Sequence, residues 1–307
     1  MFIQDNLSWI NVKLACKCLG VKRSCYYDWV KNSEKRQMLK RKREKILTLI
    51  KQEHTNSKQR YGSIKIAKSL RNKGVTVNHK KIEKLMRENQ IKSIVAKKYK
   101  ATTNSNHGLP VFNNVLNREF ESKKANHAWV GDITYIPTDE GWLYLATVID
   151  LYSNKIIGYA MSERINKGLV IDALNMALKA RNYPTNVIVH SDRGSQYASN
   201  AYRNLINRHN LIGSMSRKGN CWDNAVAENF FSIIKKEYIS KVKFTSRNQA
   251  KLGIFDYIEG WYNSQRIHSK IGYLSPNDFE DMNKDSRLIA SNQAVQSNIR
   301  VGAGNPC

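Results

Sequence analysis

The chain has 307 residues, of which 41% are hydrophobic and 25% charged, and its formal net charge is +26 at pH 7. It contains no apolar run approaching the roughly 18 residues of a membrane-spanning helix, and its first residues do not resemble a signal peptide, so we expect a cytoplasmic protein with no membrane partner. Its five cysteines, an odd number without the spacing of zinc ligands, argue against a disulfide framework and a zinc finger.

The positive charge is concentrated in the first third of the chain. Residues 1–100 contain 27 Lys and Arg against 7 Asp and Glu, a net charge of +20, whereas residues 101–307 contain 24 against 18, a net charge of +6. A basic excess confined to one region predicts a phosphate-binding surface whose affinity falls steeply with salt. A lysine-rich surface that is merely solvated is the alternative.

Residues 1–33 are predicted to form a short helix-turn-helix-like segment. Apolar residues recur at helical spacing up to Gly20, which supplies a turn. Ser24 is then placed to cap a second helix over residues 25–30. Such a pair of helices can bind DNA, and a helical hairpin with a purely structural role is the alternative.

Residues 34–95 are predicted to form a basic helical domain that binds DNA. Residues 34–53 have the pattern of a charged amphipathic helix, and two shorter helices follow, one ended by Gly74 and one capped by Asn78. The predicted inward-facing residues of the three helices are Leu39, Ile46, Leu49, Ile50, Ile64, Ala67, Leu70, Ile82, Leu85 and Met86. The predicted DNA contacts on the outer faces of the last helix are Lys80, Lys81, Lys84 and Arg87. A domain used mainly for contacts between subunits is the alternative.

A linker and a catalytic region are predicted to follow. Residues 96–118 lose helical periodicity and gain polar and turn residues, which is typical of a linker. The catalytic region spans residues 119–282. Its predicted elements are strands at 129–136, 142–151 and 154–160, a helix capped by Asn166, a strand at 187–191, a helix at 199–209 and a strand at 211–215. This order predicts an α/β domain with a mixed sheet flanked by helices on both faces.

The remaining segments of the catalytic region are predicted from their composition. The polar and basic residues 216–221 are a candidate mobile loop that orders on DNA. Ser246 begins an amphipathic helix, and its predicted inward-facing residues are Leu252, Phe255, Ile258 and Tyr262. Residues 283–307 are rich in Asn, Ser and Gln and are predicted to form a flexible tail.

Three acids stand out in this region. Asp132 lies inside the first predicted strand, and Asp192 directly follows the fourth. Glu228 lies on a helix with Asp223 as its predicted N-cap, and it shares a face with Lys235 away from the apolar stripe. Ionised carboxylates are costly to bury without a partner, and 59 and 35 residues separate the three acids along the chain. We therefore expect the fold to bring them together.

Converging carboxylates with little sulfur or imidazole nearby suit hard cations such as Mg²⁺ or Mn²⁺. Two such ions can hold the attacking and leaving oxygens of an in-line phosphoryl displacement, which is how DNA is cut and joined. Asp132, Asp192 and Glu228 are therefore the candidate metal ligands and catalytic residues, and three unrelated surface acids are the alternative. His190 and His268 are expected to form structural hydrogen bonds rather than to bind metal.

Four motifs surround these acids. They are Trp129-x-Gly131-Asp132-Ile133-Thr134-Tyr135, His190-Ser191-Asp192-Arg193-Gly194-Ser195-Gln196-Tyr197, Asp223-Asn224-Ala225-x-x-Glu228-x-Phe230-Phe231-x-x-x-Lys235, and Tyr262-Asn263-x-x-Arg266-x-His268-Ser269-x-x-Gly272-Tyr273-x-Ser275-Pro276. In these motifs the chain resembles the second-reading-frame transposases of the IS3 family of insertion sequences, which have an Asp-Asp-35-Glu core and are related to retroviral integrases. The matches extend over most of residues 10–280.

The resemblance implies a ribonuclease-H-like catalytic fold, two catalytic Mg²⁺ or Mn²⁺ ions and strand transfer from a free 3′-hydroxyl. The implied partners are double-stranded DNA, namely the inverted-repeat ends of the transposon and the target, further copies of the chain on DNA, and an upstream-frame DNA-binding protein. Lys235 is the implied phosphate contact near the scissile bond. Arg193 and Gln196 follow Asp192 closely enough to orient DNA, although Gln196 could equally hold the loop backbone.

Two other functions remain open from the sequence. A catalytically inactive, domesticated transposase would act as a DNA-binding regulator, which binds DNA without cutting it. A nuclease that resolves branched DNA would cut without joining.

Overall fold

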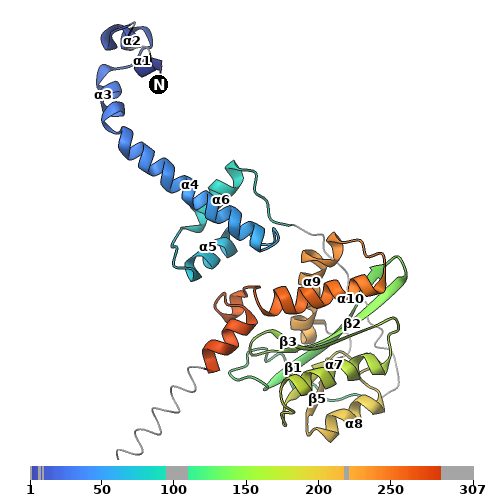
Figure 1. The fold of residues 1–307 in the computed structure, drawn as a ribbon. Coiled ribbons are helices and arrows are strands. Elements are labelled where there is room, and N and C mark those ends of the chain that lie inside the picture. Colours follow the sequence, from blue (N-terminus) through green and yellow to red (C-terminus); the bar gives the residue numbers. More distant parts are fainter. Residues whose placement is uncertain (1, 6–7, 9, 95–109, 218–220, 285–307) are drawn as a thin grey trace, which may run out of the picture. The chain divides into compact units, whose positions relative to one another are not determined.

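The computed structural model describes residues 2–5, 8, 10–94, 110–217 and 221–284, and Figure 1 shows how they are folded. The chain divides into two compact units, Met1–Ser93 and Ile94–Cys307. The predicted tail beyond residue 284, most of the predicted linker and residues 218–220 of the predicted loop lie outside the described residues. In the described part of the chain, no helix is both long and apolar enough to cross a bilayer.

The first three helices form a small module with its own core. Helices α1 (Phe2–Asp5), α2 (Val12–Cys18) and α3 (Arg23–Lys31) bury Ile3, Ala15, Cys16 and Tyr26. Gly20 makes the turn between α2 and α3 with a φ of +64°, a conformation that glycine adopts without strain. The predicted pair of helices is confirmed, but the predicted cap is wrong. Helix α3 begins one residue before Ser24, and Lys22 occupies the capping position without a side-chain hydrogen bond.

The rest of the first unit is the predicted basic helical domain. It consists of α4 (Ser33–Asn56), α5 (Ser63–Asn72) and α6 (His79–Glu88). The apolar side chains buried between the three helices include Ile50, Ile66, Leu70, Ile82 and Leu85. Asn78 caps α6 as predicted, because its side chain accepts a 2.9 Å hydrogen bond from the backbone N–H of Lys80.

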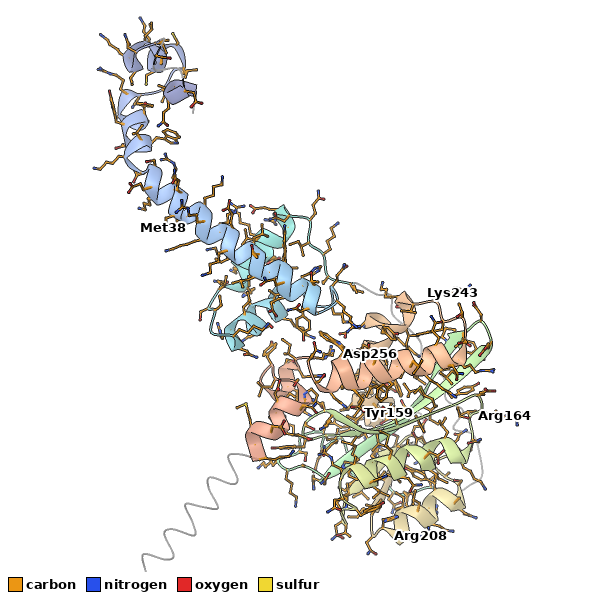
Figure 2. All side chains as sticks on the ribbon, in the orientation of Figure 1. Met38, Tyr159, Arg164, Arg208, Lys243 and Asp256 are labelled. Atoms are coloured by element: carbon orange, nitrogen blue, oxygen red, sulfur yellow. The ribbon has the colours of Figure 1, made fainter. Side chains whose placement is uncertain are left out.

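Two inward-facing predictions in this domain are wrong. Leu39 is exposed, like its neighbour Met38 (Figure 2), because the buried residues of α4 lie in the second half of that helix. Ile64 is also exposed, and Ile66 takes its place in the core. The buried stripe of α5 therefore lies further round the helix than the sequence pattern indicated.

The second unit is built on a five-stranded mixed sheet. The strands are β1 (Ala128–Thr138), β2 (Gly141–Asp150), β3 (Lys155–Ser162), β4 (Ile188–Ser191) and β5 (Ile212–Met215). Their order in the sheet is β3-β2-β1-β4-β5. The first three strands pair antiparallel, whereas β4 pairs parallel with both β1 and β5. The ends of β1, β4 and β5 that point toward the carboxyl terminus consequently share one edge of the sheet.

Helices cover both faces of this sheet, as predicted (Figure 1). Helices α7 (Lys167–Ala180) and α8 (Asn200–Arg208) lie on one face, and α9 (Ala225–Glu237) and α10 (Arg247–Phe255) lie on the other. Asn166 caps α7 as predicted, accepting a 3.1 Å hydrogen bond from Leu169. Helix α7 packs so closely on β3 that a Cβ atom at Gly158 would lie 2.2 Å from the carbonyl oxygen of Ala173. Only glycine fits that position.

The helical segment that follows Ser246 buries two of its four predicted inward-facing residues, Ile258 and Tyr262, and exposes the other two. Leu252 is 72% exposed and Phe255 is 54% exposed, whereas Ile254 and Tyr257 are buried. The α-helix ends at Phe255 and continues as a wider π-helix over Asp256–Asn263. The buried residues of α10 are Ala250 and Ile254, so Leu252 and Phe255 lie on the exposed side of that helix.

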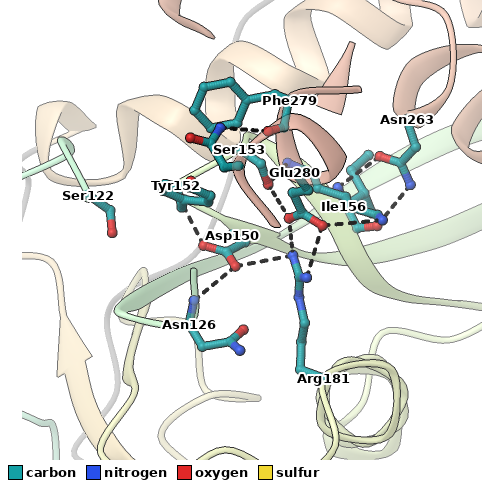
Figure 3. A network of polar contacts seen from close by, with 12 residues as sticks. Ser122, Asn126, Asp150, Tyr152, Ser153, Ile156, Arg181, Asn263, Phe279 and Glu280 are labelled. Carbon is teal, nitrogen blue, oxygen red and sulfur yellow. Dashed lines mark hydrogen bonds and ion pairs between the residues drawn. The ribbon is translucent and has the colours of Figure 1, made fainter. Parts of the chain in front are cut away.

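A buried polar network ties the last helical segment to the sheet (Figure 3). Arg181, just after α7, contacts Asp150 at the end of β2 (3.2 Å) and both carboxylate oxygens of Glu280. Ser153 also donates a 2.6 Å hydrogen bond to Glu280. Asn263 fastens the π-helix to β3, because its side chain pairs with the backbone N–H and carbonyl of Ile156 at 3.0 and 2.9 Å.

The described end of the predicted linker belongs to the second unit. Phe112 packs against the core of the sheet, and Leu116 is buried. The backbone N–H groups of Val115 and Leu116 donate to the hydroxyl of Ser214 at 3.0 and 3.1 Å. The sequence around Asn113 and Asn114 is polar and rich in turn residues, so it indicated a linker. The packing of Phe112 and the hydrogen bonds of Val115 and Leu116 could not be inferred from that composition.

Candidate active site

Parallel pairing of β1 and β4 brings the two aspartates to the same edge of the sheet. Val130 pairs with His190, so continuing that register by two residues places Asp132 level with Asp192. Neighbouring strands are about 4.8 Å apart. The Asp132 carboxylate is nearly buried and accepts a 2.8 Å hydrogen bond from the backbone N–H of Ile133. Asp192 accepts one of 2.9 Å from the backbone N–H of Gly194, which holds the side chain in the turn after β4.

Helix α9 brings the third acid to this edge. Its buried face consists of Ala227, Phe230, Phe231 and Ile234, as predicted, and it packs against β1. The side chain of Asn224 at the start of the helix donates a 3.4 Å hydrogen bond to the carbonyl of Gly131, directly before Asp132. Glu228 lies in the first turn of α9, where a negative charge is favoured by the helix dipole. It is half-buried.

The three carboxylates interact through their charges. Burial raises the pKa of the Asp132 carboxyl well above its usual value, and the charges of Asp192 and Glu228 raise it further. Burial also raises the pKa of Glu228, again with a contribution from Asp192. The charges of Asp192 and Glu228 therefore disfavour ionisation of Asp132, and the charge of Asp192 disfavours ionisation of Glu228, as expected for carboxylates at short range.

The donor set fits a hard divalent cation. Carboxylate oxygens are the ligands that Mg²⁺ and Mn²⁺ prefer, and a cation among them would relieve the repulsion that raises these pKa values. Among the residues that the structure describes, no three His, Cys, Asp or Glu side chains are already arranged to hold a metal ion. Coordination by Asp132, Asp192 and Glu228 therefore stays a prediction that the electrostatics favours.

Lys235 lies two turns beyond Glu228 and belongs to the same cluster. Its ammonium nitrogen is 4.5 Å from the centre of the Tyr135 ring, next to the acid strand β1. Burial lowers the pKa of Lys235, whereas the charge of Asp132 raises it. The lysine is therefore near the acids and only partly solvated, in contrast to a lysine on an open surface.

The other predicted contacts near Asp192 have structural partners. Arg193 donates a 2.6 Å hydrogen bond from Nε to the backbone carbonyl of Ser216, which joins the turn after β4 to the segment after β5. The amide oxygen of Gln196 lies over Gly194, 3.0 Å from where a Cβ atom would be. This position is consistent with the alternative in which Gln196 holds the loop.

The two histidines are structural, as expected. His190 is fully buried between two hydroxyl groups, with Nδ1 2.9 Å from Ser214 and Nε2 3.2 Å from Ser216. Burial lowers its pKa to about 4, so the ring is neutral at pH 7. His268 is buried beside the guanidinium of Arg266.

Asp223 is not the cap of the Glu228 helix. It lies in a 3₁₀ turn (Cys221–Asn224), one residue too early, and its carboxylate is completely buried. It accepts hydrogen bonds from Arg118 (Nε, 2.7 Å), Arg217 (Nε, 2.9 Å) and the side chain of Asn114 (3.0 Å). Hydrogen bonds from Arg217 lower the pKa of this carboxyl below its usual range, more than burial raises it. Two arginines therefore replace the helix amide that the prediction assigned to Asp223.

A second ion pair, which the sequence did not suggest, holds the other end of α9. Glu237 is the last residue of that helix, where an acid opposes the helix dipole. It accepts hydrogen bonds from Arg266 (2.9 Å), Tyr257 (2.9 Å) and the indole N–H of Trp261 (3.2 Å). Arg266 belongs to one of the four motifs. Its pairing with Glu237 could not be inferred from the sequence, because 29 residues separate Arg266 from Glu237.

The predicted DNA contacts of the first unit are all on the surface. Lys80, Lys81, Lys84 and Arg87 are exposed side chains of α6, and the residues of that helix that face its core are Ile82, Leu85 and Met86. They belong to a different compact unit from the acids. A role in DNA binding is compatible with this exposure and is not tested by it.

Comparison with protein families assigns most of the chain. A family of integrase core domains matches residues 122–221, and a second family model of the same description matches residues 228–283. An HTH-like domain family matches residues 41–99. The first unit thus contains an HTH-like domain, and the second unit contains an integrase core.

Among curated proteins, the chain is 42% identical over 283 residues to the transposase InsF for insertion sequence IS3A of Escherichia coli strain K12. The alignment covers 92% of this chain and 98% of InsF. The chain is also 42% identical over 266 residues to an uncharacterized 31 kDa protein of insertion element IS600 from Shigella sonnei, covering 87% of this chain and 97% of that protein.

Solved structures give weaker matches. A simian T-cell lymphotropic virus intasome in complex with a PP2A regulatory subunit matches with a TM-score of 0.41 and 15% identity, covering 71% of this chain and 69% of that chain. The HTLV-2 integrase catalytic core domain in complex with magnesium matches with a TM-score of 0.37 and 16% identity, covering 48% of this chain and 91% of that chain.

Proposed function

The chain belongs to the IS3 family of insertion-sequence transposases, and on that basis we propose that it cuts transposon ends and joins them to target DNA by metal-dependent phosphoryl transfer. The observation that carries this proposal is the mutual charge interaction of Asp132, Asp192 and Glu228, which come from β1, the end of β4 and α9. These three carboxylates have no such reason to meet in a protein that only binds DNA.

In this proposal the three acids hold two divalent cations, Mg²⁺ or Mn²⁺. The bound cations supply an activated oxygen nucleophile, first from water and then from the 3′-hydroxyl, and stabilise the leaving oxygen. Asp192, which directly follows strand β4, would be one of the ligands. No serine or tyrosine is required as a nucleophile, because neither step passes through a covalent link between protein and DNA.

The basic helical domain supplies the binding energy for double-stranded DNA. The exposed cations of α6 contact phosphates, and the HTH-like family match supports this assignment. Further copies of the chain, and an upstream-frame DNA-binding protein, complete the assembly on the two transposon ends.

A strand-transfer assay tests the proposal. The purified chain is incubated with labelled duplexes that end in the inverted repeats of its element, target DNA and Mg²⁺. Labelled ends joined to target DNA are the expected product. Cleavage without joining would instead favour a nuclease, and binding without either would favour a DNA-binding regulator.

Replacing Lys84 by Ala is expected to weaken DNA binding about equally for all sequences. The slope of log K against log salt concentration is negative. Each lost phosphate contact reduces its magnitude by about 0.9, because one fewer counterion is released. The measurement is a titration of duplex DNA at several salt concentrations. The control is Glu83→Ala, which removes an exposed acid from the same helix and should not reduce the slope. An unchanged slope for Lys84→Ala would assign that side chain to solvent.

Replacing Lys235 by Ala is expected to slow cleavage about 10- to 100-fold, because a charge-assisted hydrogen bond contributes about 1.5–3 kcal/mol. Lys235→Arg keeps the charge and should retain most of the activity. Single-turnover cleavage of a labelled end measures the effect. If Lys235→Ala binds and cuts DNA normally, the lysine serves only to cover Tyr135.

A further inference from the structure

An exposed tryptophan lies next to the acid cluster. Trp222 is 70% exposed, whereas tryptophan is normally buried over most of its surface. It belongs to the 3₁₀ turn (Cys221–Asn224) that leads into the Glu228 helix, and the adjacent Asp223 is completely buried. The chain therefore presents a large aromatic ring to solvent from a firmly anchored turn.

This turn is attached to the residues that precede both candidate catalytic aspartates. On one side, Asn224 donates a hydrogen bond to the carbonyl of Gly131, directly before Asp132. On the other side, Asp223 accepts hydrogen bonds from Arg217, and the residue before Arg217 donates a 2.9 Å hydrogen bond to the carbonyl of Ser191, directly before Asp192. Trp222 is consequently built onto the same edge of the sheet as the acids.

Two guanidinium groups contact the residue next to Trp222. Arg118 and Arg217 share the single carboxylate of Asp223, and their side chains remain 43% and 49% exposed. An exposed aromatic ring on the residue adjacent to a carboxylate that binds two partly exposed guanidinium groups suits nucleic acid, because the ring can stack on a base while the cations contact phosphates. An apolar protein partner would leave both arginines facing a surface of low polarity, at a cost in desolvation.

We propose that the indole of Trp222 stacks on an unpaired base of the DNA end held at the acid cluster, with Arg118 and Arg217 at the neighbouring phosphates. The inference rests on the proposed function. Base faces inside a duplex are covered by their neighbours, so the ring can stack on an unpaired base only after that base has left the duplex. The transposon end would therefore be opened locally when it binds.

The test compares two variants on two forms of one DNA end. Affinities are measured without cleavage, in the Asp192→Asn background, for a fully paired inverted-repeat end and for the same end with its last base pairs mismatched. Trp222→Ala is expected to lower the affinity about 5- to 150-fold, the usual effect of one base-stacking contact, and Trp222→Phe should recover most of it. Mismatches should strengthen binding by the tryptophan protein and leave the alanine variant unaffected.

Several outcomes would overturn the inference. Equal affinities of Trp222→Ala and the tryptophan protein would exclude a stacking contact. Equal losses with alanine and phenylalanine, or a lowered melting temperature, would assign Trp222 to the structure of the turn. A change in self-association without DNA would assign the ring to a protein interface. The proposed function is judged separately by strand transfer with the unaltered chain, which can succeed whether or not Trp222 stacks on a base.

Discussion

An Asp192→Asn variant is expected to bind transposon-end DNA normally and to cut it about a thousandfold more slowly, or not at all. Asparagine keeps the oxygen that accepts the backbone N–H of Gly194, so the turn after β4 should retain its shape. It lacks the negative charge that a divalent cation requires. Loss of metal-dependent charge stabilisation costs several kcal/mol in the transition state, and each 1.36 kcal/mol slows the reaction tenfold.

Single-turnover cleavage of a labelled end measures this effect, alongside the affinity for the same DNA. The matched control is Asp172→Asn, which makes the same substitution at an exposed position on α7 and should leave both quantities unchanged. Cleavage by Asp192→Asn at a normal rate would show that Asp192 is not a catalytic metal ligand, and it would contradict the proposed metal site.

An Arg181→Met variant is expected to lose about 3–5 kcal/mol of unfolding free energy. Arg181 is the cation between Asp150 and Glu280, both of which are buried (Figure 3). Methionine fills a similar volume but removes the cation shared by the two buried carboxylates, while Glu280 keeps its 3.4 Å ion pair with Lys155. Urea unfolding of the two proteins gives the difference. Arg164→Met, at an exposed position (Figure 2), is the control and should change stability by less than about 0.5 kcal/mol.

The loss of stability in Arg181→Met is expected to depend on pH. In the unaltered protein, burial raises the pKa of Asp150, and burial of Glu280 is outweighed by hydrogen bonds and charge from Arg181, so that its pKa is lowered. Removing Arg181 raises both values above those of the unfolded chain. A carboxyl group with a raised pKa binds its proton more tightly in the folded state, so stability falls as pH rises above about 4. The difference in unfolding free energy between the unaltered protein and Arg181→Met should therefore be smaller at pH 5 than at pH 8. Equal differences at the two pH values would contradict an electrostatic origin.

Local patterns in the sequence were sufficient to predict most helices and strands of both units. Asn78 and Asn166 cap helices as predicted, because an N-cap involves residues only two or three apart. The sequence predicted that the fold brings the acids together, whereas the parallel pairing of β1 with β4 that places Asp132 level with Asp192 came only from the structure. The acids themselves were identified from motifs, and their electrostatic interaction in the structure is consistent with that choice.

The wrong predictions share a different origin. Asp223 was assigned to the nearest helix amide, whereas Arg118, 105 residues away, is one of its actual partners. Leu252 and Phe255 were assigned to the core because they are apolar residues at helical spacing, whereas the buried residues of α10 are Ala250 and Ile254. Leu39 was assigned to the core because amphipathic spacing predicts a face and cannot show where along a long helix the packing stops.

Some of the side chains that hold the elements of the second unit in place are translated after the acids. Asp132 and Asp192 are translated before Arg266, which holds the end of α9, and before Glu280, which is linked through Arg181 to the end of β2. Domains generally fold as units once their chain is available. The nascent chain therefore contains all three acids before Arg266 and Glu280, which help to fix the elements around them, have been added.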